Sequence, residues 1–355
     1  MIWTPPVFIG DRPVGPGHPC YIVAEAGVNH GGSLHSAKTL IHHAAWAGAD
    51  AVKFQAYRSA NVVAKHTPKA DYQKLSTNPD ESQLDMLRRL ELSGDALLSL
   101  SGYARRHGIT FLCSIFDEAS AATYYQLDPP AFKLGSGELT NLPLLSHVAA
   151  YGKPMIVSTG MGNAEECRHA VSAIRMQLNF RGLILLHCVS QYPARLEDCN
   201  LRAMETLASM FRLPVGFSDH TLGLAAPIAA VAMGAVMVEK HLTLGRYANT
   251  NPDEGASIKV LEFKAMVENI RALEQGMGNG VKGPTEEERQ MGLVARKSIV
   301  AAQDIPAGTV VNRGWVAMKR PGTGIPPGEY FRIDRKRAKK LIPADTVLEE
   351  GMFES

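Results

Sequence analysis

Eight short apolar runs recur along the chain, and a turn and then a helical stretch follow each of them. The runs are Tyr21–Ala26, Ala51–Gln55, Ile109–Ser114, Ala131–Leu134, Met155–Ser158, Leu183–Cys188, Pro214–Ser218 and Ala235–Lys240. Strands that alternate with helices in this way form parallel βαβ units. Eight units close a (β/α)8 barrel, whose usual length of ~250 residues fits Tyr21 to about Gly278. We therefore predict an α/β fold with a TIM barrel. An open doubly wound sheet is disfavoured, because no glycine-rich fingerprint follows the first run.

The spacing of these runs is irregular at one place. Most predicted strands start 22 to 31 residues after the one before, but 58 residues separate Ala51 from Ile109. The extra length holds His66–Tyr72 and a helical pattern at Glu81–Leu92, so we predict a long loop at the barrel mouth. The helices expected between strands include Leu34–Trp46, Ala96–His107, Leu142–Tyr151, Glu165–Leu178 and Leu224–Met233.

The composition changes after Gly276. Residues 276–284 are rich in glycine, and residues 285–290 are charged and helix-forming. Short strands, prolines and glycines dominate the remainder of the chain. We predict a barrel domain at residues 1–280, a linker at 281–292 and a small β-rich domain at 293–355.

Composition and charge exclude several classes of protein. The chain has 355 residues, 45% of them hydrophobic, and a formal net charge of +2, so no overall field favours nucleic acid or an anionic membrane. No apolar run reaches the ~18 residues of a membrane span, and the N-terminal segment lacks the pattern of a signal peptide. The five cysteines form no CxxC pair. We expect a cytoplasmic protein with small-molecule substrates and no nucleic-acid or membrane partner.

Nearly every predicted strand ends in a polar or charged residue. These residues are Glu25, Lys53, Gln55, Ser114, Lys133, Ser158, His187, Ser190, Ser218, Asp219, His220, Glu239, Lys240 and His241. The active site of a TIM barrel lies at the C-terminal ends of its strands. We therefore expect the catalytic centre among them.

Two lysines, Lys53 and Lys133, lie within apolar strands. Two ammonium groups that converge inside one barrel need an anion to balance them, and phosphate or a phospho-carboxylate is the natural one, with serines as neutral donors. Two other roles stay open. One lysine can form a Schiff base, since an amine beside another cation has a depressed pKa, or the lysines can pair with Glu25 or Glu138.

His220 and His241 stand just past the ends of two predicted neighbouring strands. Two imidazoles with carboxylates nearby and no cysteine suit Mn²⁺, Mg²⁺ or a similar ion in a partly hydrated site. The alternative is that each is a hydrogen-bonded structural histidine.

Ten short motifs, in order along the chain, resemble the sialic acid synthase family, whose members include N-acetylneuraminate, legionaminate and pseudaminate synthases. They are residues 24–32 (AEAGVNHGG), 48–55 (GADAVKFQ), 68–73 (PKADYQ), 133–138 (KLGSGE), 158–161 (STGM), 186–193 (LHCVSQYP), 216–221 (GFSDHT), 238–244 (VEKHLTL), 295–298 (ARKS) and 319–324 (KRPGTG). The last two fall where the family has its antifreeze-like (SAF) domain. The resemblance extends from about Tyr21 to the C-terminus, so the small domain is expected to be an SAF domain.

The resemblance implies a reaction. Phosphoenolpyruvate condenses with the open-chain aldehyde of an N-acetylated hexosamine, such as N-acetylmannosamine or a 2,4-diacetamido-hexose, to give a nine-carbon 2-keto acid and phosphate. A divalent metal, Mn²⁺ or Mg²⁺, is the expected cofactor.

The resemblance also implies a role for each site residue. By the family pattern, phosphoenolpyruvate would be held by Lys53, Lys133, Ser136, Ser158 and Ser218, with Gln55, Ser114 and Ser190. The expected metal ligands are His220 and His241. The residues expected to meet the sugar hydroxyls are Glu25, Tyr192 and Asp253. The candidate for moving a proton is Glu138. The candidate catalytic residues are Glu25, Lys53, Lys133, Glu138 and His220.

Arg320 matches the SAF-domain arginine that reaches the barrel of the partner subunit and contacts the N-acetyl group. The resemblance therefore implies a domain-swapped homodimer. Residues 251–257 (NPDEGAS) depart from the family pattern after Asp253, in a segment expected to touch the sugar.

Two other functions remain possible from the residues alone. One is a pyruvate-type aldolase on the same barrel, with Lys53 or Lys133 as the Schiff base. The other is a non-catalytic carbohydrate-binding protein that keeps the SAF domain.

Overall fold

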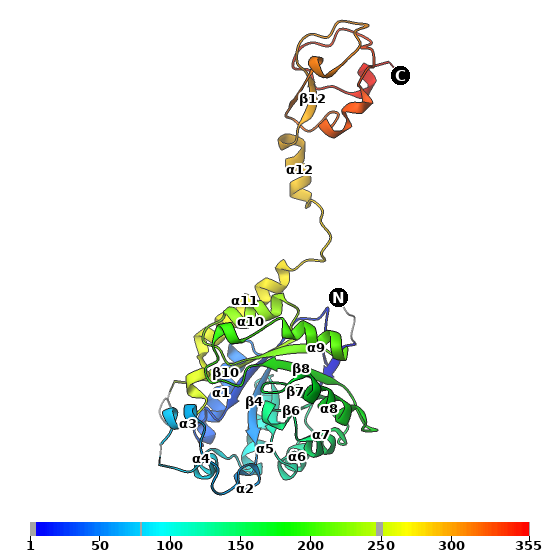
Figure 1. Cartoon of the computed structure of the whole chain (residues 1–355). Helices are drawn as coiled ribbons and strands as arrows, with labels where there is room; N and C mark the ends of the chain where they lie inside the picture. The colour runs from blue at the N-terminus through cyan, green and yellow to red at the C-terminus, as the bar shows by residue number, and fades with distance from the viewer. Residues whose placement is uncertain (1–4, 79, 246–250, 355) are drawn as a thin grey trace. The chain divides into compact units, whose positions relative to one another are not determined.

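The computed structural model describes residues 5–78, 80–245 and 251–354. The chain divides into two compact units, Met1–Gly278 and Asn279–Ser355 (Figure 1). Each unit has a hydrophobic core of its own.

Eight parallel strands form a closed barrel in the first unit. They are β3 (Tyr21–Gly27), β4 (Ala51–Ala56), β5 (Thr110–Ile115), β6 (Phe132–Leu134), β7 (Met155–Ser158), β8 (Leu183–Cys188), β9 (Val215–Asp219) and β10 (Met237–Thr243). Each strand pairs with the next, and β10 pairs with both β9 and β3, which closes the ring. A short strand, β11 (Ile258–Lys259), pairs with β10. The TIM-barrel prediction is confirmed, and every predicted strand end lies within three residues of the observed one.

The alternation of side chains along each strand separates the barrel interior from its outer face. On β4, Val52 and Phe54 belong to the large apolar cluster that packs under the helices. Ala51 belongs instead to the smaller interior cluster. Lys53 and Gln55 follow Ala51 on the same face. The interior is therefore apolar at the N-terminal ends of the strands and polar at their C-terminal ends.

Eight helices accompany the barrel strands in the described part of this unit (Figure 1). They are α1 (Leu34–Trp46), α5 (Gly94–Arg106), α6 (Glu118–Tyr125), α7 (Leu142–Ala149), α8 (Ala164–Arg175), α9 (Ala203–Phe211), α10 (Ala225–Ala232) and α11 (Val260–Gly276). Side chains cap several of them: Ser33, Ser93, Asp117 and Asn163 each accept a hydrogen bond from a first-turn N–H. The five helices named from the sequence are present, with ends within three residues of those predicted.

An antiparallel hairpin, β1 (Val7–Ile9) and β2 (Arg12–Val14), precedes the barrel. It was not predicted from the sequence. Its buried side chains Val7, Ile9 and Val14 join the interior apolar cluster with Ile184 and Met237. The hairpin therefore covers the N-terminal end of the barrel.

The extra length predicted between Ala51 and Ile109 lies between β4 and α5 and contains three helices, α2 (Ser59–Val62), α3 (Asp71–Ser76) and α4 (Gln83–Leu90). Helix α4 lies within the helical pattern expected at residues 81–92. Its side chains Met86 and Leu90 form an apolar cluster with Val28 and Tyr57, and this contact attaches the insertion to the barrel.

The second unit is small. It contains α12 (Glu286–Ala295), which has no buried residue, and two antiparallel strands, β12 (Ser298–Ala301) and β13 (Val316–Lys319), which contribute to an apolar core that includes Ile299, Ile305 and Leu348. The predicted limits 1–280, 281–292 and 293–355 stay a prediction, because compactness alone does not separate a linker helix from the domain that comes after it. In the described ranges, no helix combines the length and the apolar character needed to cross a membrane.

We expect His30 to make the stability of the barrel depend on pH. Its side chain is 1% exposed and accepts a hydrogen bond from the Gly32 N–H at 3.0 Å. Burial lowers the pKa of His30 from 6.5 to about 4. Between these values the unfolded chain holds more protons than the folded one, so acidification favours unfolding.

This group alone should cost about 2 kcal/mol of unfolding free energy between pH 7 and pH 5. In His30→Asn the amide oxygen replaces the Nδ1 acceptor and does not titrate. Urea denaturation at both pH values should show a smaller loss of stability for the variant than for the parent. An equal loss in both proteins would remove His30 as the source.

Candidate active site

Polar side chains fill the interior of the barrel at the C-terminal ends of its strands. They are Glu25 on β3, Lys53 and Gln55 on β4, Ser114 on β5, Lys133 on β6, Ser158 on β7, Ser218 on β9 and Glu239 on β10. All of them except the half-buried Gln55 are buried. Buried polar groups are stable only when they bond to one another or to a ligand.

Lys53 is bound on several sides. It forms an ion pair with Glu25, and its Nζ donates a hydrogen bond to Ser114 Oγ at 2.6 Å. The same Nζ lies 3.5 Å from Glu239 Oε2. Strands β3, β4, β5 and β10 are thus linked through one ammonium group.

Glu239 connects the two lysines. Its Oε1 lies 3.7 Å from Lys133 Nζ and accepts a hydrogen bond from Ser218 Oγ at 2.8 Å. Lys133 Nζ donates to Ser158 Oγ, also at 2.8 Å. The structure therefore brings together Lys53 and Lys133, as predicted, with Glu239 between them.

Glu239 was predicted to lie at a strand end but was not among the predicted site residues. A signal was present in the sequence. Met237 lies in the interior apolar cluster, and with a period of two Glu239 and His241 must share its face.

The same alternation corrects three other positions in the predicted ring. Lys240 and Asp219 face outward and form a fully buried ion pair of 2.6 Å. Lys240 Nζ also donates to the Thr221 carbonyl oxygen. His187 shares the outward face of Leu185, and its Nε2 is 2.7 Å from the Cys199 carbonyl oxygen. These three residues stabilise the strand ends rather than line the interior.

The buried charges shift one another's pKa values. Burial raises the pKa of Glu25 to about 8, although Lys53 opposes the shift. Burial also acts on Glu239, but Lys133 and Lys53 outweigh it and lower the pKa of Glu239 to about 2. For Lys53, Glu239 and Glu25 outweigh burial and raise the pKa. For Lys133, burial prevails and the pKa is lowered.

Three polar atoms meet at Gly160, in the loop after β7. A side-chain Cβ at this glycine would lie 2.5 Å from Ser190 Oγ, 2.8 Å from Cys188 Sγ and 2.9 Å from Ser136 Oγ. Ser136 and Cys188 are 3.1 Å apart. The absence of a side chain at Gly160 therefore leaves room where two of the predicted phosphate-binding serines converge.

His220 and His241 face each other, with ring centroids 5.5 Å apart. The ring of Tyr192 lies 4.2 Å from His220 and 5.8 Å from His241. His220 Nδ1 is 2.7 Å from the Val189 carbonyl oxygen. In the tautomer that donates this bond, Nε2 keeps a free lone pair. Burial lowers the pKa of both histidines, so both are neutral at pH 7.

Asp253 adjoins this pair. Its Oδ2 lies 3.7 Å from His241 Nδ1 and accepts a hydrogen bond from the Val28 N–H at 3.4 Å. Gly27 has a φ of +47°, and a Cβ there would lie 2.6 Å from Asp253 Oδ2, 3.1 Å from Glu25 Oε1 and 3.6 Å from Gln55 Nε2. Burial raises the pKa of Asp253 to about 6.

Two predicted site residues, Glu138 and Arg320, bond to residues outside the lysine cluster. Glu138 lies on a 3-10 turn after β6 and accepts a hydrogen bond from Asn141 Nδ2 at 2.7 Å. Within the described ranges, no ion pair joins Glu138 to Lys53 or Lys133. Arg320 belongs to the second unit, where its Nε donates to the Ala295 carbonyl oxygen at 3.0 Å.

The fit of a divalent metal can be judged from the donor atoms. The described residues include no group of three or more metal-ligating side chains. His241 Nδ1 and Glu25 Oε1 are buried without a hydrogen bond to another described residue. Buried polar atoms of this kind are normally bonded to a ligand or to ordered water. The two neutral imidazoles therefore fit an ion that takes its remaining ligands from water and substrate.

Comparison with known proteins identifies the family of each unit. The NeuB family matches residues 40–282, and the SAF domain matches residues 296–354.

Individual relatives span nearly the whole chain. N,N'-diacetyllegionaminic acid synthase of Legionella pneumophila is 41% identical over 342 residues, which cover 96% of each chain. N-acetylneuraminate-9-phosphate synthase of Mus musculus is 34% identical, over 96% of this chain and 95% of the relative. The crystal structure of N-acetylneuraminic acid synthetase from Leptospira borgpetersenii has a TM-score of 0.71 and 31% identity, over 81% of this chain and 95% of the other. The resemblance found in the motifs is confirmed: the chain belongs to the NeuB family and carries a SAF domain.

Proposed function

We propose that this protein is a nonulosonic acid synthase, which condenses phosphoenolpyruvate with an N-acetylated hexosamine to a nine-carbon 2-keto sugar acid and phosphate. Two relatives with about 40% identity are named N,N'-diacetyllegionaminic acid synthase. The observation that carries the proposal is the pair of buried lysines. Lys53 and Lys133 lie on either side of one carboxylate, Glu239, and burial raises the pKa of the second carboxyl, Glu25, so the cluster is suited to bind an anion.

The phosphoenolpyruvate subsite comprises the predicted group. It consists of Lys53, Lys133, Ser136, Ser158 and Ser218, with Gln55, Ser114 and Ser190 beside them. Lysines stabilise the charge of the phosphate and carboxylate, and serine hydroxyls donate to their oxygens. Because these groups are already oriented by contacts with one another, they stabilise charge that develops as phosphate leaves.

His220 and His241 would hold a divalent metal, Mn²⁺ or Mg²⁺. When bound, such an ion polarises a carbonyl oxygen and thereby favours attack on the aldehyde carbon. The chain's own contribution is to present two neutral imidazoles, with His220 oriented by the Val189 carbonyl oxygen.

The acceptor sugar would bind against Tyr192, Asp253 and Glu25, at the outer side of the lysine cluster. Glu25, with a pKa of about 8, can hold or release a proton near neutral pH, and Glu138 is a second candidate for proton transfer. Arg320 of a partner subunit would contact the N-acetyl group in a domain-swapped homodimer.

The aldolase alternative depends on a lysine nucleophile. Glu239 and Glu25 keep Lys53 protonated, which makes it a poor nucleophile, whereas the lowered pKa of Lys133 suits a Schiff base. Borohydride reduction in the presence of pyruvate decides between the two, because only an aldolase gives a covalent adduct.

The first prediction concerns phosphate release. With Mn²⁺ present, phosphate should be released from phosphoenolpyruvate only when an acceptor is added, from a panel of N-acetylmannosamine, its 6-phosphate and 2,4-diacetamido-6-deoxy hexoses. Lys53→Met and Lys133→Met should each lower kcat/KM by roughly 10³-fold or more, since each removes a charge that the phosphate requires. Lys264→Met, on the outer helix α11, is the control. Release by neither parent nor control would refute the proposal.

The metal role is tested by binding as well as by activity. Each chain should bind about one Mn²⁺ by titration calorimetry, and EDTA should abolish turnover until Mn²⁺ or Mg²⁺ is restored. His220→Ala and His241→Ala should weaken Mn²⁺ binding, whereas His169→Ala, an exposed histidine of α8, should not. Full turnover in EDTA would exclude a metal-dependent reaction.

The exchanged-domain dimer predicts complementation between two inactive variants. Lys53→Ala inactivates the site in the barrel, and Arg320→Ala removes the contact that the SAF domain makes with the N-acetyl group. A heterodimer of the two contains one intact site if Arg320 acts on the partner's barrel. Coexpression in equal amounts should restore about a quarter of the parental activity. If Arg320 acts within its own chain, no activity returns.

A further inference from the structure

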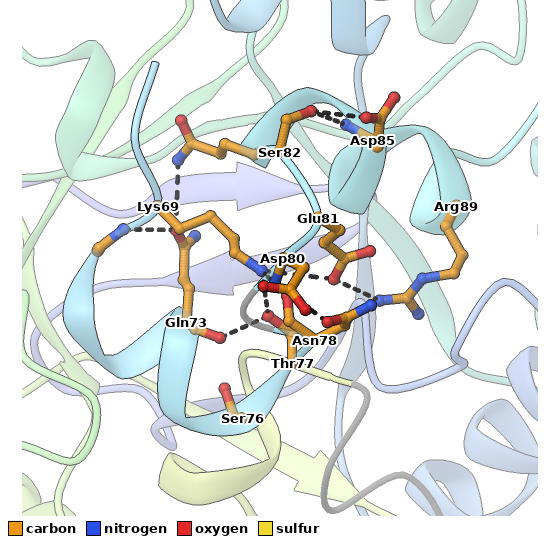
Figure 2. Close-up of polar contacts among 12 residues, drawn as sticks. Lys69, Gln73, Ser76, Thr77, Asn78, Asp80, Glu81, Ser82, Asp85 and Arg89 are labelled. Atoms are coloured by element: carbon orange, nitrogen blue, oxygen red, sulfur yellow. Dashed lines mark hydrogen bonds and ion pairs between the residues drawn. The ribbon is translucent and has the colours of Figure 1, made fainter. Parts of the chain in front are cut away.

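A buried lysine connects two helices of the insertion between β4 and α5. Lys69, just before α3, is 6% exposed. Its Nζ donates to Thr77 Oγ1 at 2.9 Å and to the Asn78 carbonyl oxygen, and it lies 3.6 Å from Glu81 Oε1 (Figure 2). Because a buried ammonium is costly without partners, these contacts hold the start of α3 and the start of α4 together.

Helix α4 is itself attached to the barrel. A Cβ on Gly32, in the loop after β3, would lie 2.5 Å from the Arg89 carbonyl oxygen, so the helix backbone approaches this loop closely. Tyr57 donates a hydrogen bond to the Leu87 carbonyl oxygen at 3.1 Å. Glu81 also pairs with Arg89 at 3.4 Å (Figure 2). Through Lys69 and Glu81, the position of α3 is therefore set relative to the barrel.

Helix α3 brings Tyr72 to the candidate active site. The ring of Tyr72 stacks on the ring of Tyr192, with centroids 5.2 Å apart and planes inclined by 21°. Tyr192 in turn packs on His220. Burial raises the pKa of Tyr72, and the charge of the Asp253 carboxylate raises it further. Tyr72 thus adjoins Tyr192, one of the three residues assigned above to the acceptor sugar.

We infer that Tyr72 is a specificity residue for the acceptor sugar and that Lys69 is the positioning residue that holds it beside Tyr192. The inference rests on the proposed function, which assigns Tyr192 and Asp253 to the acceptor. An aromatic face packs on C–H and methyl groups. Tyr72 therefore suits the carbon face and the acetamido methyl of an acetylated hexosamine.

Steady-state kinetics test the role of Tyr72. Tyr72→Leu keeps apolar bulk but removes the ring face, and it should raise KM for the acceptor roughly tenfold while KM for phosphoenolpyruvate stays within about twofold. Tyr72→Phe keeps the ring and should stay close to the parent. An equal rise in both KM values, or no rise in either, would overturn the inference.

A double-mutant cycle tests the role of Lys69. Lys69→Met should raise KM for the acceptor as Tyr72→Leu does. The double variant should have the same KM for the acceptor as Tyr72→Leu alone, because both substitutions remove the same contact between Tyr72 and the sugar. Lys74→Met is the matched control: Lys74 lies on helix α3, is exposed and pairs with Asp71, and its substitution should leave both KM values unchanged. Additive effects of the two substitutions would refute the positioning role.

Calorimetric binding separates this inference from the proposed function. Parent protein and Tyr72→Leu are titrated with N-acetylmannosamine, with its 6-phosphate and with a 2,4-diacetamido hexose, without turnover. Weaker binding of a neutral sugar to the variant supports the role of Tyr72, even if the parent releases no phosphate from phosphoenolpyruvate. Equal binding of each sugar to both proteins contradicts it.

Discussion

The carboxylate of Glu239 lies between two buried ammonium groups, and the arrangement of the barrel interior depends on it. One oxygen is 3.5 Å from Lys53 and the other is 3.7 Å from Lys133. Without this carboxylate the two lysines would face each other in an interior that excludes water, where like charges repel strongly. Glu239 stabilises the cluster in the absence of substrate and yet leaves it able to accept an anion, because burial raises the pKa of the second carboxyl, Glu25, and so opposes its ionisation.

The fold could be predicted from the sequence because its determinants, the apolar runs and the turn and helix that follow each run, are local. An apolar run of four to six residues followed by a turn and a helix specifies a βαβ unit wherever it occurs, and eight such units leave little choice of architecture. The hairpin of β1 and β2 escaped prediction because its strands are three residues long each and carry no periodic pattern. Its three buried side chains acquire their role only once a barrel interior exists for them to fill.

The site residues that lie on the barrel strands could be predicted from the sequence. Lys53 and Lys133 were recognisable because a lysine within an apolar strand is unusual. Glu239 needed one further step, the comparison of its face with that of Met237. Tyr72 and Lys69 could not be placed from local pattern at all, since their contacts with Tyr192 and Thr77 depend on the path of a long insertion. For such residues tertiary contact, not periodicity, determines position.

The hairpin of β1 and β2 covers the N-terminal end of the barrel, so ligands can enter the interior from the C-terminal end alone. Since Val7, Ile9 and Val14 pack into the interior cluster, the N-terminal end of the barrel is closed, and the lysines lie toward the other end, where Tyr72, Tyr192 and Asp253 also stand. An acceptor bound at those three residues would stand in the path of phosphoenolpyruvate. With the two subsites as proposed, the inner ligand has to bind before the outer one.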